Sequence, residues 1–112
     1  MTEAQKKLLT DIWQAVLHID VHLKGRRDRG EFVNDITQQR AVERELEIIG
    51  EATNKLIKLQ PDFPLSSARK IINLRNRVIH AYDDVNLIIV WKVIITDIPV
   101  LFKEVEELLS KE

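Results

Sequence analysis

The stretch that decides the fold runs from Leu87 to Leu109 and reads LIIVWKVIITDIPVLFKEVEELL. Its first part, Leu87 to Ile95, is rich in valine and isoleucine, which would suit a β-strand. Along the whole stretch, however, apolar residues recur at helical intervals and form the stripe Leu87, Trp91, Ile94, Ile98, Leu101, Val105 and Leu108. The stretch therefore predicts α-helix rather than strand.

This stripe keeps its phase through Pro99, which predicts either one helix bent at the proline or two nearly collinear helices. In the second case Asp97 would cap the second helix. Between Val85 and Ile95 nearly every side of the helix is apolar, which is more than the neighbours within a four-helix bundle would cover. Burial on several sides, including against a second subunit, would account for this surplus.

The same periodicity predicts two long helices earlier in the chain, over residues 3–23 and 35–59. Asp35 and Gln38 have the spacing of a capping box at the start of the second one. A third helix should follow the proline-containing turn after residue 59. Ser66 or Ser67 should cap this third helix, and its core side should carry Ile71, Leu74 and Val78. Asp83 and Asp84 can cap the fourth helix, which contains Leu87.

The composition is that of one helical domain. The chain has 112 residues, 45% of them hydrophobic and 31% charged, with only three glycines and three prolines. This length fits a single domain over residues 1–112. Because the chain contains no cysteine, disulfides, thiolate nucleophiles and zinc–thiolate sites are excluded. We therefore expect an all-α fold, an antiparallel (up-and-down) bundle of four to five helices.

No segment is suited to secretion or to membrane insertion. The N-terminal sequence MTEAQKK leads into a charged amphipathic segment, unlike a secretion signal. The most apolar run, Leu87 to Ile95, contains Lys92 and has about half of the ~20 residues that a membrane-spanning helix needs. We therefore expect a soluble, cytoplasmic protein with no membrane partner.

Positive charge is concentrated in two segments, although the net charge is only −1. The first segment, Lys24 to Gly30, contains two glycines and is predicted to be a loop, after which Phe32 and Val33 return to the core. The second segment, Arg69 to His80, contains four basic residues besides the histidine and no acidic one. A solvated face is the simpler explanation of such a run unless a site lies beside it.

The second basic segment runs into the octet RNRVIHAY, Arg75 to Tyr82, which includes the only tyrosine of the chain. On a regular helix Asn76 lies one turn before His80 and can orient its imidazole, as a catalytic histidine requires. Arg75 lies roughly opposite His80 and would join it only through its long side chain, a distorted helix end or a subunit interface. Without a site, the same residues are a favourably placed histidine at a helix C-terminus and solvated arginines.

The octet resembles R-x-x-x-x-H-x-Y, the motif of the HepT toxins in the HEPN (higher eukaryotes and prokaryotes nucleotide-binding) superfamily. The resemblance extends through RAVERELEIIGEA (Arg40 to Ala52) and V-x-L-x-x-V-W (Val85 to Trp91), and so covers most of the chain. It implies a HEPN-like homodimer that is a metal-independent endoribonuclease, the toxin of a toxin–antitoxin pair, with motif residues around an intersubunit cleft. The partner in such pairs is MntA, a small nucleotidyltransferase that silences the toxin by adding AMP to the motif tyrosine.

This resemblance places the catalytic arginine and histidine on Arg75 and His80, the adjacent polar residue on Asn76, and the AMPylated tyrosine on Tyr82. An imidazole that titrates near neutrality can accept the proton of a ribose 2′-hydroxyl, and a guanidinium can hold two phosphate oxygens. No cofactor and no metal are implied. The neighbouring basic residues expected to bind RNA are Arg69, Lys70 and Arg77.

Two other patterns have simpler explanations. His18 and His22 have the spacing of a helical metal pair, but no glutamate lies between them as in H-E-x-x-H and no third ligand is evident. Glu43, Glu47 and Glu51 lie one turn apart and fit a solvated face better than acid–base work, although glutamates there would also fit the wall of a dimer cleft.

Two other functions are compatible with the same sequence. The first is a non-catalytic helical subunit that presents substrate to a nucleotidyltransferase or is merely modified by it. The second is a plain dimerisation domain, in which Arg75 and His80 of two chains would not converge on a cleft. The complete motif favours the nuclease, and the sequence leaves open which RNA is cut and where.

Overall fold

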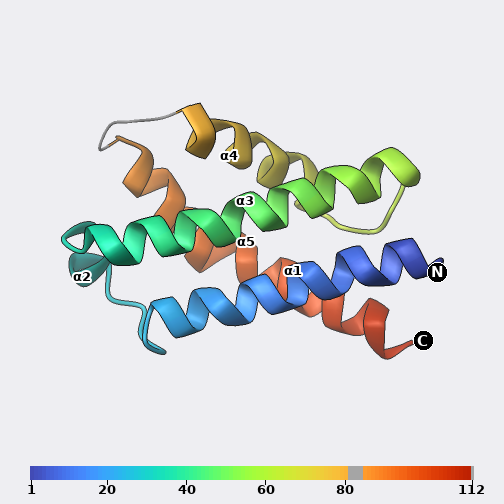
Figure 1. The fold of residues 1–112 in the computed structure, drawn as a ribbon, viewed down its shortest axis with the longest axis horizontal. Helices are drawn as coiled ribbons and strands as arrows, with labels where there is room; N and C mark the ends of the chain where they lie inside the picture. Colours follow the sequence, from blue (N-terminus) through green and yellow to red (C-terminus); the bar gives the residue numbers. More distant parts are fainter. Residues whose placement is uncertain (81–84, 112) are drawn as a thin grey trace.

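The chain folds into five helices that surround one apolar core (Figure 1). A computed structural model describes residues 1–80 and 85–111; for residues 75–80 and 85–86 it describes the helical backbone but not the side chains. The helices are α1 (Glu3–His22), α2 (Arg29–Val33), α3 (Ile36–Leu59), α4 (Ala68–His80) and α5 (Val85–Ser110). Every regular element within these described ranges is a helix, which confirms the all-α prediction.

Helices α1, α3 and α4 lie side by side, each antiparallel to its neighbour, and α5 crosses them obliquely (Figure 1). The short helix α2 lies at the end of the molecule where α3 begins, and both chain termini lie toward the other end. The predicted up-and-down arrangement thus describes three helices, whereas α5 runs diagonally across them. The expected homodimer stays a prediction.

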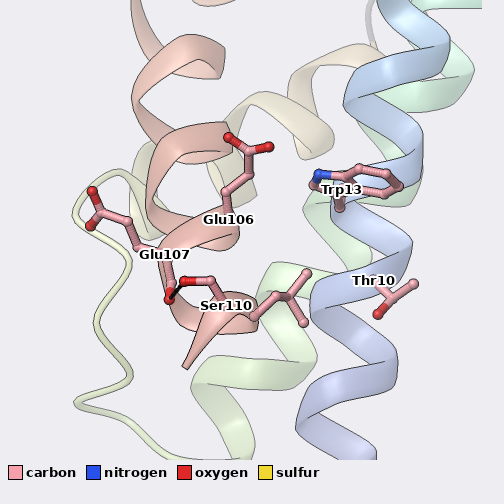
Figure 2. Close-up of a pocket in the computed structure, with 6 residues that line it drawn as sticks. Thr10, Trp13, Glu106, Glu107 and Ser110 are labelled. Atoms are coloured by element: carbon pink, nitrogen blue, oxygen red, sulfur yellow. Dashed lines mark hydrogen bonds between the residues drawn. The ribbon is translucent and has the colours of Figure 1, made fainter. Parts of the chain in front are cut away.

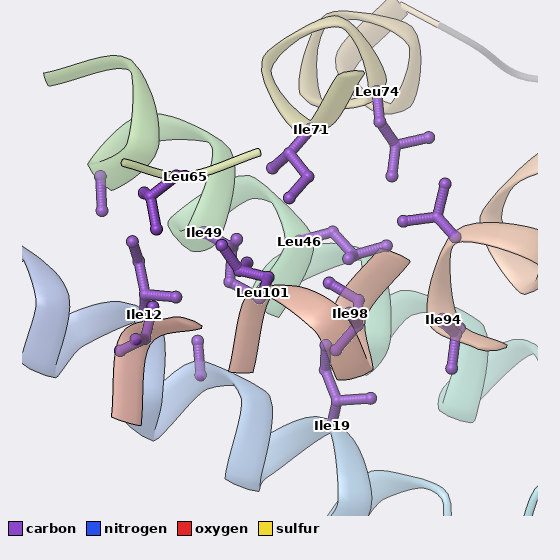
Figure 3. Close-up of a cluster of buried hydrophobic side chains, with 14 of the residues drawn as sticks. Ile12, Ile19, Leu46, Ile49, Leu65, Ile71, Leu74, Ile94, Ile98 and Leu101 are labelled. Carbon is purple, nitrogen blue, oxygen red and sulfur yellow. The ribbon is translucent and has the colours of Figure 1, made fainter. Parts of the chain in front are cut away.

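The core forms where the apolar stripe of α5 meets α1 and α3. Figure 3 shows Ile98 and Leu101 of α5 lying among Leu46 and Ile49 of α3 and Ile19 of α1, all of them at most 3% exposed. Burying one such side chain stabilises the fold by roughly 1.5–3 kcal/mol. The predicted stripe is confirmed: its fully buried members are Ile94, Ile98, Leu101 and Val105, and its partly buried members are Leu87, Trp91 and Leu108.

Helix α5 continues unbroken through Pro99 as a single helix, which also excludes a strand over Leu87 to Ile95. The prediction that Asp97 caps a second helix is therefore wrong, because no helix begins after it. Its carboxylate is instead buried and lies 3.2 Å from Nζ of Lys70 in α4. Neither α5 nor any other helix in the described part of the chain is long and apolar enough to cross a membrane.

Helix α1 has the predicted length because both of its ends are fixed locally. At the start, Gln5 N donates to Thr2 Oγ1 (3.1 Å) and Thr2 N donates to Gln5 Oε1 (3.0 Å), a complete capping box. At the end, Gly25 adopts a φ of +70° and its N–H donates to the carbonyl of Asp20 (2.9 Å). Lys24, directly ahead of it, already adopts a φ of +59°, so the helix is stopped by two successive residues in the left-handed region, a conformation that glycine tolerates best.

The start of α3 shows half of the predicted capping box. Asp35 accepts a hydrogen bond from Gln38 N (3.0 Å). The Gln38 side chain does not return to Asp35; its Nε2 donates instead to the carbonyl of His22 (3.0 Å), at the end of α1. The Gln38 side chain thus links the start of α3 to the end of α1 instead of completing the capping box.

A helix that the sequence did not predict begins inside the arginine-rich segment: Arg29 and Gly30, expected in the loop, form the first turn of α2. Asp28 caps α2 by accepting from Glu31 N (3.1 Å). Phe32 is fully buried as predicted, with its ring centroid 5.3 Å from that of Trp91. Val33, however, is exposed, so its predicted return to the core is wrong. Successive side chains of a helix point about 100° apart, and a single turn cannot bury both neighbours against one face.

Helix α4 begins directly after Ser67, whose carbonyl accepts from Ile71 N (3.0 Å). Ile71 and Leu74 are buried, as predicted from their spacing. The predictions for the side chain of Val78, and for Asp83 and Asp84 as caps of α5, lie outside the described residues.

The packing of α5 against α3 can be tested with one matched pair of leucines in α3. Leu46 is 1% exposed and Leu59 is 59% exposed. We expect Leu46→Ala to lower the free energy of unfolding by about 2–5 kcal/mol, and Leu59→Ala to change it by less than about 0.5 kcal/mol. Urea denaturation followed by circular dichroism measures both values. Equal losses at the two positions would contradict this core.

Candidate functional site

The candidate site is the C-terminal half of α4, because this half carries most of the predicted catalytic octet. The helical backbone of α4 extends through Arg75, Asn76, Arg77 and His80. The side chains of these residues, and all of Tyr82, lie outside the described residues, so their roles stay predictions. What the structure describes is the scaffold that places this half of the helix.

Two carboxylates of α5 hold the beginning of α4. The backbone N–H of Ser66, just ahead of α4, donates to both carboxylate oxygens of Glu104 (3.2 Å each). One turn into the helix, Nζ of Lys70 lies 3.2 Å from Oδ2 of Asp97. Together with the buried side chains of Ile71 and Leu74, these contacts fix α4 relative to α5.

The Asp97 carboxylate is the buried charge of this scaffold. Its Oδ2 is fully buried and accepts no hydrogen bond from the residues that the structure describes, although the Lys70 ammonium is within ion-pair distance. A buried carboxylate is costly unless a cation compensates its charge, so Lys70 serves as that cation. Since the Lys70 side chain is 57% exposed, part of it faces solvent, and its predicted contact with RNA stays a prediction.

A polar side of α3 faces α4. The two helices are antiparallel, so the N-terminal half of α3 lies opposite the C-terminal half of α4 (Figure 1). By helical period, Glu43 and Glu47 lie on the same side of α3 as Asn54, which lines a pocket together with residues of α4. The sequence predicted that Glu43, Glu47 and Glu51 lie on a solvated face. Glu51 is exposed as predicted, whereas Glu43 and Glu47 are half-buried.

Burial raises the pKa of the Glu43 carboxyl above its usual range. The guanidinium of Arg40 acts in the opposite direction, and the carboxylate of Glu47 adds to the increase. Glu47 itself is paired with Arg44, whose NH1 lies 3.3 Å from its Oε2. The side of α3 that faces the candidate site thus carries a carboxyl group whose protonated form is favoured by its surroundings.

The arginine-rich loop is largely neutralised by its own neighbours. Arg26 NH2 donates to Oε1 of Glu31 (3.0 Å), and Arg27 NH1 donates to Oδ1 of Asp20 (3.0 Å). Lys24 Nζ also lies 3.8 Å from Oε1 of Glu31. These ion pairs explain a charge cluster that the sequence left without a role.

The two histidines of α1, His18 and His22, both contact one carboxylate of α3. Nε2 of His22 lies 2.8 Å from Oε2 of Glu45, and Nδ1 of His18 lies 3.7 Å from Oε1 of the same group. Within the described ranges, no three His, Asp or Glu side chains are arranged to hold a metal ion. Glu45 is buried, and its position between Val42 and Ile49 on the core side of α3 was the signal that could have indicated this contact.

A groove larger than the others described below lies between α1 and the end of α5, far along the chain from the octet. It has a volume of about 660 Å³. Figure 2 shows Trp13 of α1 facing Glu106 of α5 across it, and the Trp13 ring stacks on Phe102 with centroids 6.4 Å apart. The residues that line it are Thr10, Trp13, Glu106, Glu107, Leu109 and Ser110. The exposed carboxylates of Glu106 and Glu107 make this groove unfavourable for a polyanion.

The chain is similar to proteins of one family. The family described as Ribonuclease HepT-like matches residues 12–108. The chain is 35% identical over 112 residues to the "Probable ribonuclease HepT" of Thermococcus cleftensis, which covers 96% of this chain and 98% of that protein. It is 41% identical over 83 residues to the "Putative RNase TTE0752" of Caldanaerobacter subterraneus subsp. tengcongensis, covering 73% of this chain and 74% of that protein. It is also 39% identical over 80 residues to the "Putative RNase MJ1380" of Methanocaldococcus jannaschii, covering 70% and 73%. No solved structure gives a significant match.

The raised pKa of Glu43 predicts a pH-dependent gain in stability on replacing this residue. A carboxyl whose pKa is higher in the folded state than its usual 4.5 stabilises the fold below that value and loses this contribution as the pH rises through the folded-state pKa. Glu43→Gln removes the cost of ionisation, so its free energy of unfolding, relative to wild type, should increase between about pH 4 and pH 7. Urea denaturation at several pH values measures this difference. The exposed Glu51→Gln controls for the loss of one negative charge, and a difference for Glu43→Gln that falls with rising pH would contradict the prediction.

Proposed function

Because the chain belongs to the HepT-like ribonuclease family, we propose that it is a metal-independent endoribonuclease and the toxin of a toxin–antitoxin pair. Arg75 and His80 are its catalytic residues, and Asn76 orients His80. The observation that carries the proposal is the octet RNRVIHAY in a chain that is 35% identical, over nearly its whole length, to a protein named as a probable ribonuclease HepT.

The chemistry needs only groups that this chain contains. The imidazole of His80 accepts the proton of a ribose 2′-hydroxyl, the 2′-oxygen attacks the adjacent phosphorus, and the bond to the 5′-oxygen breaks. The products are a 2′,3′-cyclic phosphate and a 5′-hydroxyl. The Arg75 guanidinium holds phosphate oxygens and stabilises the charge that develops on them. Because the attack uses the 2′-hydroxyl, DNA is not a substrate.

A second subunit completes the site in this proposal. Two copies of His80 at one intersubunit cleft allow one imidazole to act as the base and the other to protonate the leaving 5′-oxygen. Support for a partner subunit comes from the first half of α5, where Ile88 is 67% exposed and Ile95 is 44% exposed. Exposed apolar side chains on one helix are typical of an interface.

The proposed regulation acts on Tyr82, which lies two residues beyond His80. A nucleotidyltransferase antitoxin of the MntA type transfers AMP from ATP to its hydroxyl, with release of pyrophosphate. The added group brings bulk and negative charge to the place where the substrate phosphate must enter, so cleavage stops. Both the RNA substrate and this antitoxin are cytoplasmic partners in the proposal.

The alternative is a non-catalytic helical subunit that binds a substrate for a nucleotidyltransferase. It would use the same fold and the same Tyr82, but it would not need the pair of Arg75 and His80. The retention of both residues in the octet favours the nuclease.

Cleavage of RNA in EDTA tests the nuclease directly. We expect the purified wild type to cut total RNA or tRNA and to leave cyclic phosphate and 5′-hydroxyl ends. His80→Ala and Arg75→Ala should each cut at least about 100-fold more slowly, because general base catalysis and charge stabilisation are each worth roughly that much. The matched control is Arg26→Ala in the neutralised loop, which should retain the wild-type rate. Absence of cleavage by a wild type whose Tyr82 is shown by mass spectrometry to be unmodified would favour the non-catalytic alternative.

Modification of Tyr82 is tested by incubating the protein with an MntA-type nucleotidyltransferase and ATP, followed by mass spectrometry. We expect AMP to be added to the wild type, with loss of RNA cleavage. Tyr82→Phe should accept no AMP and should keep cutting RNA in the presence of the transferase, because it lacks the phenolic oxygen. AMP on another residue, or inhibition of Tyr82→Phe to the same degree, would contradict this regulation.

A further inference from the structure

A pocket with polar walls lies between α3 and α4. It has a volume of about 370 Å³, at the small end of the range of small-molecule sites. The C-terminal half of α3, the connection to α4 and the first turns of α4 all contribute to it. The residues that line it are Asn54, Ile57, Pro61, Phe63, Leu65, Ser66, Ala68, Arg69, Ile72 and Asn73.

The walls of this pocket suit one nucleotide. Ile57, Phe63 and Ile72 provide an apolar surface against which a base can pack. The carboxamides of Asn54 and Asn73 each offer donors and an acceptor, the combination that pairs with the edge of a base and above all with N6 and N7 of adenine. The guanidinium of Arg69 offers a fork of donors that fits a phosphate.

The polar groups of the pocket are available to a ligand. Within the described residues, no hydrogen bond or ion pair engages the side chains of Asn54, Arg69 or Asn73. By contrast, Lys70 on the other flank of α4 is paired with Asp97. Among the described residues that line this pocket there is no carboxylate, whereas two carboxylates line the larger groove between α1 and α5. Charge therefore favours an anion in the pocket between α3 and α4 and disfavours one in the groove between α1 and α5.

The pocket lies on the side of α4 that also carries position 80, the proposed catalytic histidine. Positions 73 and 80 of α4 are separated by about two helical turns, or roughly 10 Å, and helical period puts both on the same side of the helix. A single strand whose scissile phosphate lies at His80 can therefore run along α4 toward its beginning. The positive end of the α4 dipole, near Arg69, favours a phosphate at the far end of this path.

We propose that the pocket between α3 and α4 is a subsite for one unpaired nucleotide of the RNA substrate, preferably adenosine. Asn54 and Asn73 read the base, and Arg69 holds a phosphate beside it. This subsite rests on the proposed nuclease function, for which it supplies sequence preference near the cut. Single-stranded RNA is the form whose bases are free to enter such a pocket.

Binding of single nucleotides tests the subsite without relying on cleavage. We expect AMP, added to the full-length protein, to shift backbone NMR signals of Asn54, Ile57, Arg69 and Asn73, and to bind more tightly than GMP, CMP or UMP. Asn54→Ala and Asn73→Ala should each weaken AMP at least about fivefold and reduce its advantage over the other nucleotides. Arg69→Gln should weaken all four nucleotides to a similar degree, because a phosphate contact carries no base information.

The matched controls are Arg26→Gln, in the neutralised loop, and Gln14→Ala, on the exposed side of α1; both should bind AMP as the wild type does. Thermal unfolding followed by circular dichroism confirms that each variant is folded. Mapping of RNA cuts adds a second readout, in which Asn73→Ala should lose the preference for adenosine near the cleavage position.

The two proposals fail in different ways. If the wild type cuts RNA but no nucleotide shifts the pocket signals, or shifts only those of the α1–α5 groove, the subsite is overturned and the nuclease stands. Unchanged cut positions in Asn73→Ala would overturn it as well. If AMP binds in the pocket and the asparagine variants weaken it, but the unmodified wild type cuts no RNA, the subsite is supported as a nucleotide site and the nuclease function is overturned.

Discussion

The rest of the structure depends on the burial of one apolar stripe of α5 beneath α1 and α3. Ile98 and Leu101 occupy the centre of this contact, where they meet side chains of both helices. Because α5 crosses the other helices obliquely, its two ends reach different partners: the first half lies near α2, through Trp91 and Phe32, and the second half lies along α1, through Phe102 and Trp13. One helix thus unites elements from the whole chain, and its carboxylates also contact the beginning of α4, which packs mainly against α3.

The position of α4 is set by polar contacts as much as by its short apolar face. Ahead of the helix, Glu104 accepts a hydrogen bond from the N–H of Ser66, and one turn into it Lys70 compensates the buried charge of Asp97. These contacts lie in the N-terminal half of α4, while the proposed chemistry belongs to its C-terminal half. A helix anchored at its beginning in this way presents its far turns in a fixed direction, which is the arrangement that a preorganised site needs.

The distribution of paired and unpaired charge separates structural from functional basic residues. The loop arginines Arg26 and Arg27, which stand out in the sequence, are tied to carboxylates nearby. Arg69 has the same charge but lines a pocket with two asparagines and no acid. A polyanion is attracted by net local potential rather than by the number of arginines in a segment. Charge therefore favours an anion in the pocket between α3 and α4 over the acidic groove between α1 and α5.

The sequence by itself determined every described helix except the short α2, most of the core and the octet, because helical period, capping residues and motif spacing are local properties. The stripe of α5, the start of α3 at Asp35 and the burial of Phe32 are all confirmed. Only the tertiary structure decided the roles of Asp97, Gln38 and Glu45, since each depends on which helix lies opposite: Lys70 of α4, the end of α1, and the histidines of α1. The same holds for the pocket between α3 and α4, whose walls are far apart in sequence and meet only because the two helices pack antiparallel.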